Sequence, residues 1–152
     1  MDVSARTGDL DAVRRRRAEL RESLGALERA LAAAASGRAV VWGEQVLHAV
    51  TRLAGDFAEH VEVTEGADGL HQNILAGDLR LANQVQALTA EHADIAAAIA
   101  ELAVAVEPPV TPDDVAGVRD SGTALLGRVA RHRQRGADLI YEAYQTDIGG
   151  GD

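Results

Sequence analysis

Apolar residues recur along this chain at steps of three and four residues, the spacing that places side chains on one face of an α-helix. The pattern holds over about residues 9–35, 38–66, 78–106 and 112–146, and no segment shows the alternation of a half-buried strand. The expected core positions are Val13, Leu20, Leu24, Leu27 and Leu31 in the first segment, Val46, Val50, Leu53 and Phe57 in the second, Leu81, Val85, Leu88, Ile95, Ile99 and Leu102 in the third, and Val115, Val118, Leu125, Val129, Leu139 and Ala143 in the fourth.

Helix-breaking residues separate these segments. Ser36-Gly37 and the glycines of 66–69 end the first two helices, with one further helical turn expected over 70–74. Pro108-Pro109 ends the third helix, because proline cannot donate to the helical ladder. Thr111-Pro112 is typical of an N-cap followed by proline in the first turn of the fourth helix.

Four amphipathic helices with short links predict an all-α fold, an up-down-up-down antiparallel four-helix bundle. The bundle is expected over residues 9–147, after a flexible leader at 1–8 and before a disordered, glycine-rich tail at 148–152. A length of 152 residues suits one domain. Aromatic residues make up only 3% of the chain, which favours closely packed helices over a sheet.

The charge and composition narrow the classes of partner. With 15 basic and 24 acidic residues the formal net charge is −9, and we expect neither nucleic acid nor an anionic membrane as a partner. The absence of cysteine excludes disulfides, thiolate metal sites and thiol nucleophiles. No apolar signal region and no run of about 18 apolar residues is present, so a cytoplasmic protein is expected.

Three histidines occupy apolar helical faces. His60 continues the line of Phe57, and His92 and His132 lie within the apolar faces of the third and fourth helices. A buried imidazole needs a partner, and three of them pointing inward from three helices indicate one of three things. They form a metal site, or the remains of one in which the histidines merely hydrogen-bond each other, Arg17 or water, or a polar pocket. Counting about 1.5 Å per residue places His92 and His132 at a similar depth in the bundle.

Several longer pieces of the sequence carry a family resemblance. They are LRESLGALERAL in the first helix, TEGADGLHQNIL after His60, LTAEHADI around His92 and RHRQRGADLIYEAYQTDIGG at the end of the chain. Their order and spacing resemble the hemerythrin-like (HHE cation-binding) family over about residues 9–150. The resemblance implies a hemerythrin-like bundle around a non-haem di-iron centre with histidine and carboxylate ligands. It also implies roles in O2 or NO binding, iron handling or redox sensing.

The sequence departs from that family pattern at three positions. Arg17 stands where the family has a histidine, and Thr64 and Gly136 stand where it has glutamates. Two neighbouring cations repel each other unless anionic oxygens lie between them, so the loss of both carboxylates disfavours a di-iron centre.

A site for a single iron or zinc ion remains, with His60, His92 and His132 as ligands. Glu65 lies one step off the apolar face and is a candidate fourth ligand or a hydrogen-bond partner of a ligand, as is Glu62. An open position on such an ion would take a small ligand such as O2, NO or peroxide.

The alternative is a pocket without metal. Thr64 and Gly136 leave space beside His60 and His132, and Arg17 favours an anion there. In this hypothesis the protein binds or converts a small polar or anionic molecule, and Arg17, His60 and His132 are the catalytic candidates. A third hypothesis is a helical scaffold without catalysis.

Overall fold

The computed structural model describes residues 3–66 and 69–149, with side chains over 10–66 and 69–144. The described residues form helices and connecting segments, with no strand among them. The elements are α1 (Val3–Ala32), α2 (Ala39–Glu65), α3 (Leu70–Gly77), the 3-10 turn η1 (Leu79–Leu81), α4 (Ala82–Val106), the 3-10 turn η2 (Pro112–Asp114) and α5 (Val115–Gly149).

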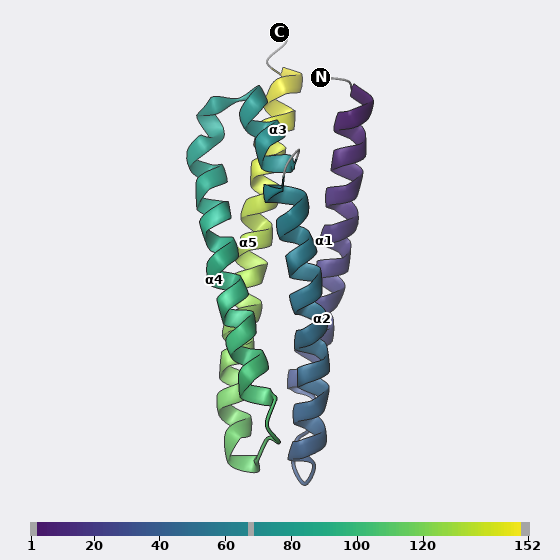
Figure 1. Ribbon diagram of the computed structural model, residues 1–152, viewed down its shortest axis with the longest axis vertical. Helices are drawn as coiled ribbons and strands as arrows, with labels where there is room; N and C mark the ends of the chain where they lie inside the picture. Colours follow the sequence, from purple (N-terminus) through teal and green to yellow (C-terminus); the bar gives the residue numbers. More distant parts are fainter. Residues whose placement is uncertain (1–2, 67–68, 150–152) are drawn as a thin grey trace.

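The four long helices form a bundle. Figure 1 shows α1 and α4 running away from the end that carries both termini, and α2 and α5 running back towards it. Each long helix packs on the next, α1 on α2, α2 on α4, α4 on α5 and α5 on α1. The short helix α3 lies at the end with the termini and contacts α1, α2 and α4. The expected all-α bundle of four antiparallel long helices is confirmed.

The helix ends differ from the sequence prediction in three places. Helix α1 begins at Val3, so the flexible leader expected at 1–8 is wrong for residues 3–8, which are helical. It also ends at Ala32 rather than about 35. Helix α5 continues to Gly149, so residues 148 and 149 of the expected tail are helical as well. Residues 1–2 of the leader and 150–152 of the tail lie outside the described residues.

Arg119 of α5 bonds carbonyl groups where α1 ends. Its Nε and Nη2 donate to the carbonyl oxygens of Leu31 and Ala33, at 3.0 and 2.8 Å. A further turn of helix would have bonded such terminal carbonyls, and here a side chain from another helix satisfies them. The same guanidinium lies 5.3 Å from the ring centroid of Trp42. Trp42 is fully buried, which makes it a core residue at this end of the bundle.

The expected start of the last helix is confirmed. Thr111 donates to the Asp114 carboxylate through Oγ1 at 2.8 Å and through its backbone N–H at 3.1 Å. Pro112 occupies the first turn. Backbone N–H groups in the first turn have no helical acceptor, so the missing N–H of proline costs no hydrogen bond there. The single turn expected at 70–74 is longer in the structure and forms α3, which ends at Gly77.

The hydrophobic core is divided into two clusters, here called the large cluster and the small cluster. All the core positions expected from the sequence are buried. The transition between clusters falls at Arg17 in α1, His60 in α2, His92 in α4 and His132 in α5. These residues form a polar layer across the bundle. The small cluster, on the side of α3 and the termini, consists of Val13, Leu70, Ile74, Leu81, Val85, Leu88, Leu139 and Ala143.

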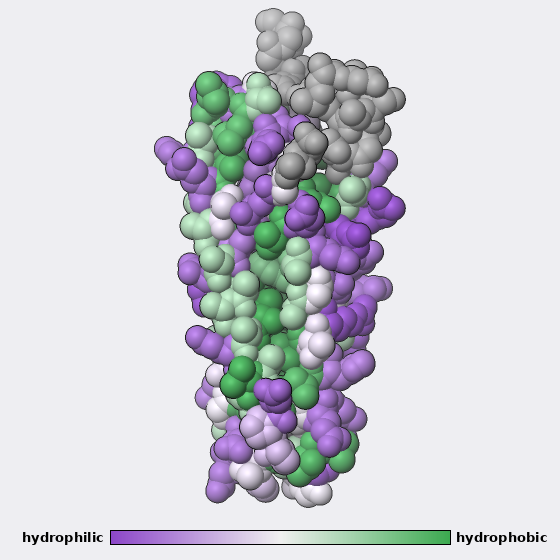
Figure 2. Space-filling model, viewed as in Figure 1, coloured by the Kyte–Doolittle hydropathy of each residue, from purple (hydrophilic) through white to green (hydrophobic). Residues whose placement is uncertain are grey.

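The outer surface follows the amphipathic pattern of the helices. Figure 2 shows hydrophilic side chains along the α1 edge of this face and weakly apolar residues along α4. The exposed apolar side chains of α4 are mostly alanines, with Val104 at 65% exposure. Within residues 3–66 and 69–149, no helix is both long enough and apolar enough to cross a lipid bilayer.

Candidate metal centre

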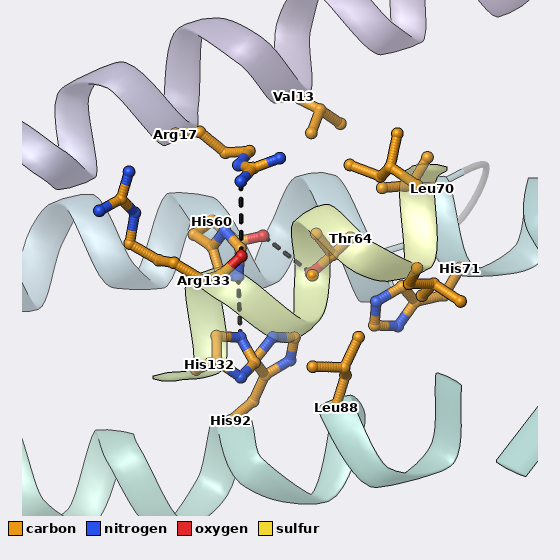
Figure 3. Close-up of a pocket in the computed structure, with 13 residues that line it drawn as sticks. Val13, Arg17, His60, Thr64, Leu70, His71, Leu88, His92, His132 and Arg133 are labelled. Atoms are coloured by element: carbon orange, nitrogen blue, oxygen red, sulfur yellow. Dashed lines mark hydrogen bonds between the residues drawn. The ribbon is translucent and has the colours of Figure 1, made fainter. Parts of the chain in front are cut away.

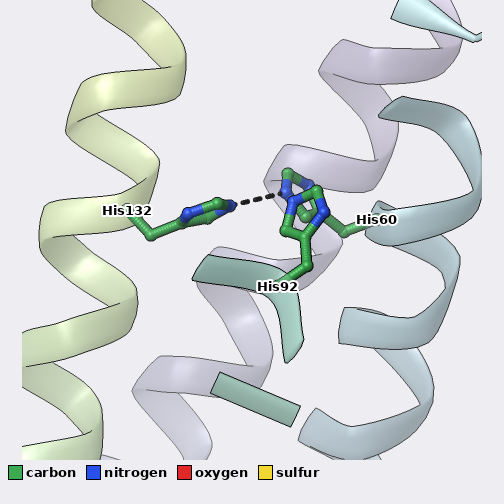
Figure 4. Close-up of side chains that lie close together, drawn as sticks. All are labelled: His60, His92 and His132. Carbon is green, nitrogen blue, oxygen red and sulfur yellow. Dashed lines mark hydrogen bonds between the residues drawn. The ribbon is translucent and has the colours of Figure 1, made fainter. Parts of the chain in front are cut away.

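His60, His92 and His132 converge in the polar layer from α2, α4 and α5 (Figure 4). Each is buried, and each offers one ring nitrogen within 4.8 Å of the ring nitrogens of the other two. Nε2 of His60 and Nε2 of His132 hydrogen-bond each other at 3.2 Å, with one ring as donor and the other as acceptor. The ring centroids of His92 and His132 are separated by 4.8 Å. The expected convergence of the three rings is therefore present.

Carboxylates contact the Nδ1 atoms of two of these rings. Nδ1 of His92 hydrogen-bonds Oε2 of Glu65, and Nδ1 of His132 lies 3.5 Å from Oε1 of Glu91. The other oxygen of Glu91 accepts from Nη1 of Arg135. A carboxylate at Nδ1 favours the tautomer with the proton on Nδ1, which leaves the Nε2 lone pair free. For His92 and His132, that lone pair is directed into the layer.

Buried ring nitrogens in this layer lack hydrogen-bond partners among the described residues: Nε2 of His92, Nδ1 of His60 and Nδ1 of His132. Buried polar atoms in native proteins are nearly always satisfied, and exceptions occur where a ligand, water or ion belongs. Because Nδ1 of His60 is one of these three nitrogens, His60, unlike His92, has no carboxylate to fix its tautomer.

Burial keeps the imidazoles of His60 and His132 neutral. Burial, reinforced by His92 and His132, lowers the pKa of His60 to about 3. Burial and the neighbouring His92 also lower the pKa of His132, against the opposing effect of Glu91. A metal ligand must present an unprotonated nitrogen, so His60 and His132 are in the ligand form at neutral pH.

Glu65 is placed as a partner of a candidate ligand. Its carboxylate bonds the far side of the His92 ring, and it does not belong to the group of converging ring nitrogens. Of the two roles expected from the sequence, the structure supports the hydrogen-bond partner. Glu62 is exposed and forms no ion pair within the described ranges.

A small cavity adjoins the three rings (Figure 3). Its volume is about 20 Å³, and its lining includes Arg17, Thr64 and Gly136 as expected. A cavity needs roughly 10–15 Å³ for one water-sized group, so this one holds one or two such groups. A Cβ added at Gly136 would meet no atom within 4 Å, which confirms open space at that position. Thr64 is different: its Oγ1 donates to the carbonyl oxygen of His60 at 2.9 Å, so the helix uses this hydroxyl.

Arg17 points towards the cavity rather than along the helix to solvent. Its Nη2 donates to the carbonyl oxygen of Arg133 at 3.4 Å, across the contact between α1 and α5 (Figure 3). Arg16, its neighbour in the arginine run, instead hydrogen-bonds Glu19 and Glu59 near the surface. Arg17 therefore lies in the pocket where the sequence places it.

His71 belongs to the cavity although the sequence pattern does not single it out. Its ring stacks on His92 with centroids 5.9 Å apart and planes 6° apart, and its Nδ1 lies 3.1 Å from Oγ1 of Thr89. Burial, with the nearby His92, lowers its pKa to about 4. The sequence could have indicated this position, because His71 and the apolar Ile74 are spaced so that they share one face of a helix. Both residues are buried.

A second group of acidic side chains lies near the surface. Glu19, Asp56 and Glu59 bring carboxylate oxygens within reach of a common ion. Arg16 bonds Glu19 and Glu59, and the Ser23 hydroxyl bonds Asp56. These partners already satisfy the carboxylates, so the group is a surface charge network.

No protein-family model, no curated protein and no solved structure matches this chain.

Proposed function

We propose that the protein binds a single metal ion, iron or zinc, through His60, His92 and His132. The observation that carries the proposal is the buried Nε2 of His92, which has no partner among the described residues and lies in a layer with two other inward imidazoles. Neutral imidazoles are common ligands of both metals.

The spacing of one pair of ring nitrogens matches that of two ligands on one ion, and all three candidate nitrogens lie within 4.8 Å of one another. Two nitrogens bound to a tetrahedral zinc at about 2.0–2.1 Å lie roughly 3.3 Å from each other. The Nε2 atoms of His60 and His132 are 3.2 Å apart. Glu65 and Glu91 would orient two of the three ligands, as carboxylates beside metal-bound histidines commonly do.

Two metal ions fit these residues poorly. Thr64 and Gly136 offer no carboxylate to bridge them, and the Arg17 guanidinium lines the adjoining cavity. Positive charge at that place opposes a second cation. The proposal is therefore a mononuclear site in a hemerythrin-like protein, with family membership resting on the sequence resemblance alone.

The bound ion would have an open position towards the cavity. Three histidines leave at least one coordination position of zinc or iron free. The cavity of about 20 Å³ admits only a small molecule, so the expected ligand is of the size of O2, NO or peroxide. Bulky organic substrates do not fit beside the three rings.

Metal analysis of untagged protein, purified without chelators, tests the proposal. We expect close to one iron or zinc per chain, and loss of the metal in His92→Ala. His48→Ala is the matched control, because His48 is exposed on α2. Two metals per chain would contradict the mononuclear site. Protein that neither contains metal nor binds added Zn2+ or Co2+ would refute the metal hypothesis.

A further inference from the structure

Arginines gather on one side of the cavity, where α1 packs on α5. Arg17 and Arg133 both line the cavity near His60 (Figure 3). The Arg17 guanidinium contacts the Arg133 main chain through its Nη2, 3.4 Å from the carbonyl oxygen. Nε of Arg133 is buried and has no hydrogen-bond partner within the described residues.

These guanidinium groups lack counter-ions. Within residues 10–66 and 69–144, no carboxylate forms an ion pair with Arg17, Arg21 or Arg133. Other arginines of the same chain are paired, such as Arg16 with Glu19 and Arg135 with Glu91. Exposed arginines such as Arg15 and Arg128 also lack an ion pair within the described part of the chain, but Arg17 and Arg133 differ from them because they are partly buried beside a cavity.

Electrostatic repulsion within the cluster agrees with this geometry. Burial lowers the pKa of Arg17, and the charge of Arg21 lowers it further. Burial likewise lowers the pKa of Arg133, with added repulsion from Arg17 and Arg21. A bound anion would relieve this repulsion and would satisfy donors such as Nε of Arg133.

We infer that Arg17 and Arg133 form a binding site for a small monovalent anion at the α1–α5 side of the cavity, beside His60. Guanidinium groups bind oxyanions by paired N–H donors, and the buried Nε–H of Arg133 is such a donor without a partner among the described residues. The anion site needs no metal. The inference rests on the proposed function in one respect: it specifies the charge of the ligand that would bind at the open coordination position of the metal ion.

The cavity also limits the size of the anion. With about 20 Å³ it has room for one or two water-sized groups, which favours a slim anion of two or three heavy atoms over a tetrahedral one. Nitrite and azide have the expected size and charge. Sulfate carries more charge but is larger than the space. A comparison of sulfate with nitrite therefore distinguishes binding in the cavity from simple attraction to surface arginines.

Titration of chelator-treated, metal-free protein with sodium nitrite tests the inference. The arginine Nε–H signals in nitrogen-15 spectra report the binding, and a salt of a large organic anion holds the ionic strength constant. We expect a saturable shift for Arg17 and Arg133, and at least tenfold weaker binding in Arg17→Met and in Arg133→Met. Methionine keeps an apolar stem in place of the arginine stem, so packing is largely retained.

Arg14→Met is the matched control. Arg14 lies on the same helix, has a side chain 76% exposed and pairs with Asp11 at 3.7 Å. Nitrite binding should be unchanged in this variant. Equal binding of sulfate and nitrite, or nitrite binding that survives both cavity substitutions, would overturn the inference. Because the titration uses metal-free protein, failure of metal binding leaves its result unchanged, and its own failure leaves the metal content unchanged.

Discussion

Nδ1 of His92 hydrogen-bonds the carboxylate of Glu65 on the neighbouring helix α2, while Nε2 of the same ring is buried without a partner. The carboxylate fixes the ring in the orientation that exposes Nε2 to His60 and His132. A histidine held in this way is a stronger and better oriented ligand than one held by packing alone.

Substitution of Glu65 should therefore weaken metal binding without removing a ligand. We expect Glu65→Ala to raise the dissociation constant for Zn2+ by about 10- to 100-fold, because the His92 ring loses its orienting partner. Glu65→Gln should have a smaller effect, since the amide oxygen still accepts a hydrogen bond. Competition with a zinc-binding dye measures the affinities. Glu62→Ala, at an exposed position of the same helix, is the control, and equal affinity in all three variants would contradict the role of Glu65.

The stability of metal-free protein should fall as the pH drops below about 6.5. Burial lowers the pKa of His60 from 6.5 to about 3, so between these values the unfolded chain binds a proton that the folded chain does not. The free energy of unfolding then decreases with falling pH, by about 1.4 kcal/mol per pH unit for one such group.

Urea unfolding at about pH 7, 6 and 5, with chelator present, measures this dependence. His60→Gln should reduce the slope by up to the amount for one group, whereas replacement of the exposed His48 should not. Parallel stability curves for the wild type and His60→Gln would show that His60 is not the group responsible. Carboxylates titrate mainly below this range, so they disturb the comparison little.

Two glycine substitutions should change stability in opposite directions. A Cβ at Gly136 meets nothing within 4 Å, so Gly136→Ala should stabilise α5 by about 0.5–1 kcal/mol. A Cβ at Gly43 would lie 2.5 Å from Cγ2 and 2.8 Å from Cβ of Val110, so Gly43→Ala should destabilise the protein by roughly 1–3 kcal/mol. Chemical unfolding of both variants measures the two effects. Destabilisation by Gly136→Ala would indicate that the space beside it is needed by the fold.

Carboxylates placed at Thr64 and Gly136 should change the number of metals bound. The double substitution Thr64→Glu and Gly136→Glu supplies two anionic groups beside the three rings, in the open space next to Gly136. We expect the metal content to rise from about one towards two per chain, because carboxylates can bridge neighbouring cations. Elemental analysis measures it, with Thr64→Gln and Gly136→Gln as the uncharged control pair. An unchanged metal content in both double variants would mean that Arg17 or the spacing of the helices decides the number of metals bound.

The helices and the core followed from periodicity, because each long helix buries a single apolar face. The positions of His60, His92 and His132 were predictable for the same reason, since each interrupts such a face. Helix ends were less predictable. Near the end of α1, the carbonyls of Leu31 and Ala33 are bonded by Arg119 from α5, a partner that the local sequence does not indicate.

The residues around the candidate ligands were harder to predict than the ligands. Glu91 is adjacent to His92 in sequence, yet its carboxylate lies beside His132 on another helix. That contact depends on how α4 is rotated against α5, which an apolar pattern defines only to within a residue. His71 and Arg133 lie next to the apolar faces of their helices, so the apolar pattern does not single them out. Their role depends on a cavity that exists only after the helices pack.

The polar layer also divides the hydrophobic core into two parts. The small cluster contains few side chains, and it is separated from the large cluster by histidines and an arginine rather than by continuous packing. Segments with little apolar burial open more often than the rest of a protein, and amide hydrogen exchange detects this opening. We expect amides of α3 and the neighbouring helix ends to exchange faster than those around Trp42. An ion held between α2, α4 and α5 would join the two parts, so metal should slow exchange most at the end that carries the termini.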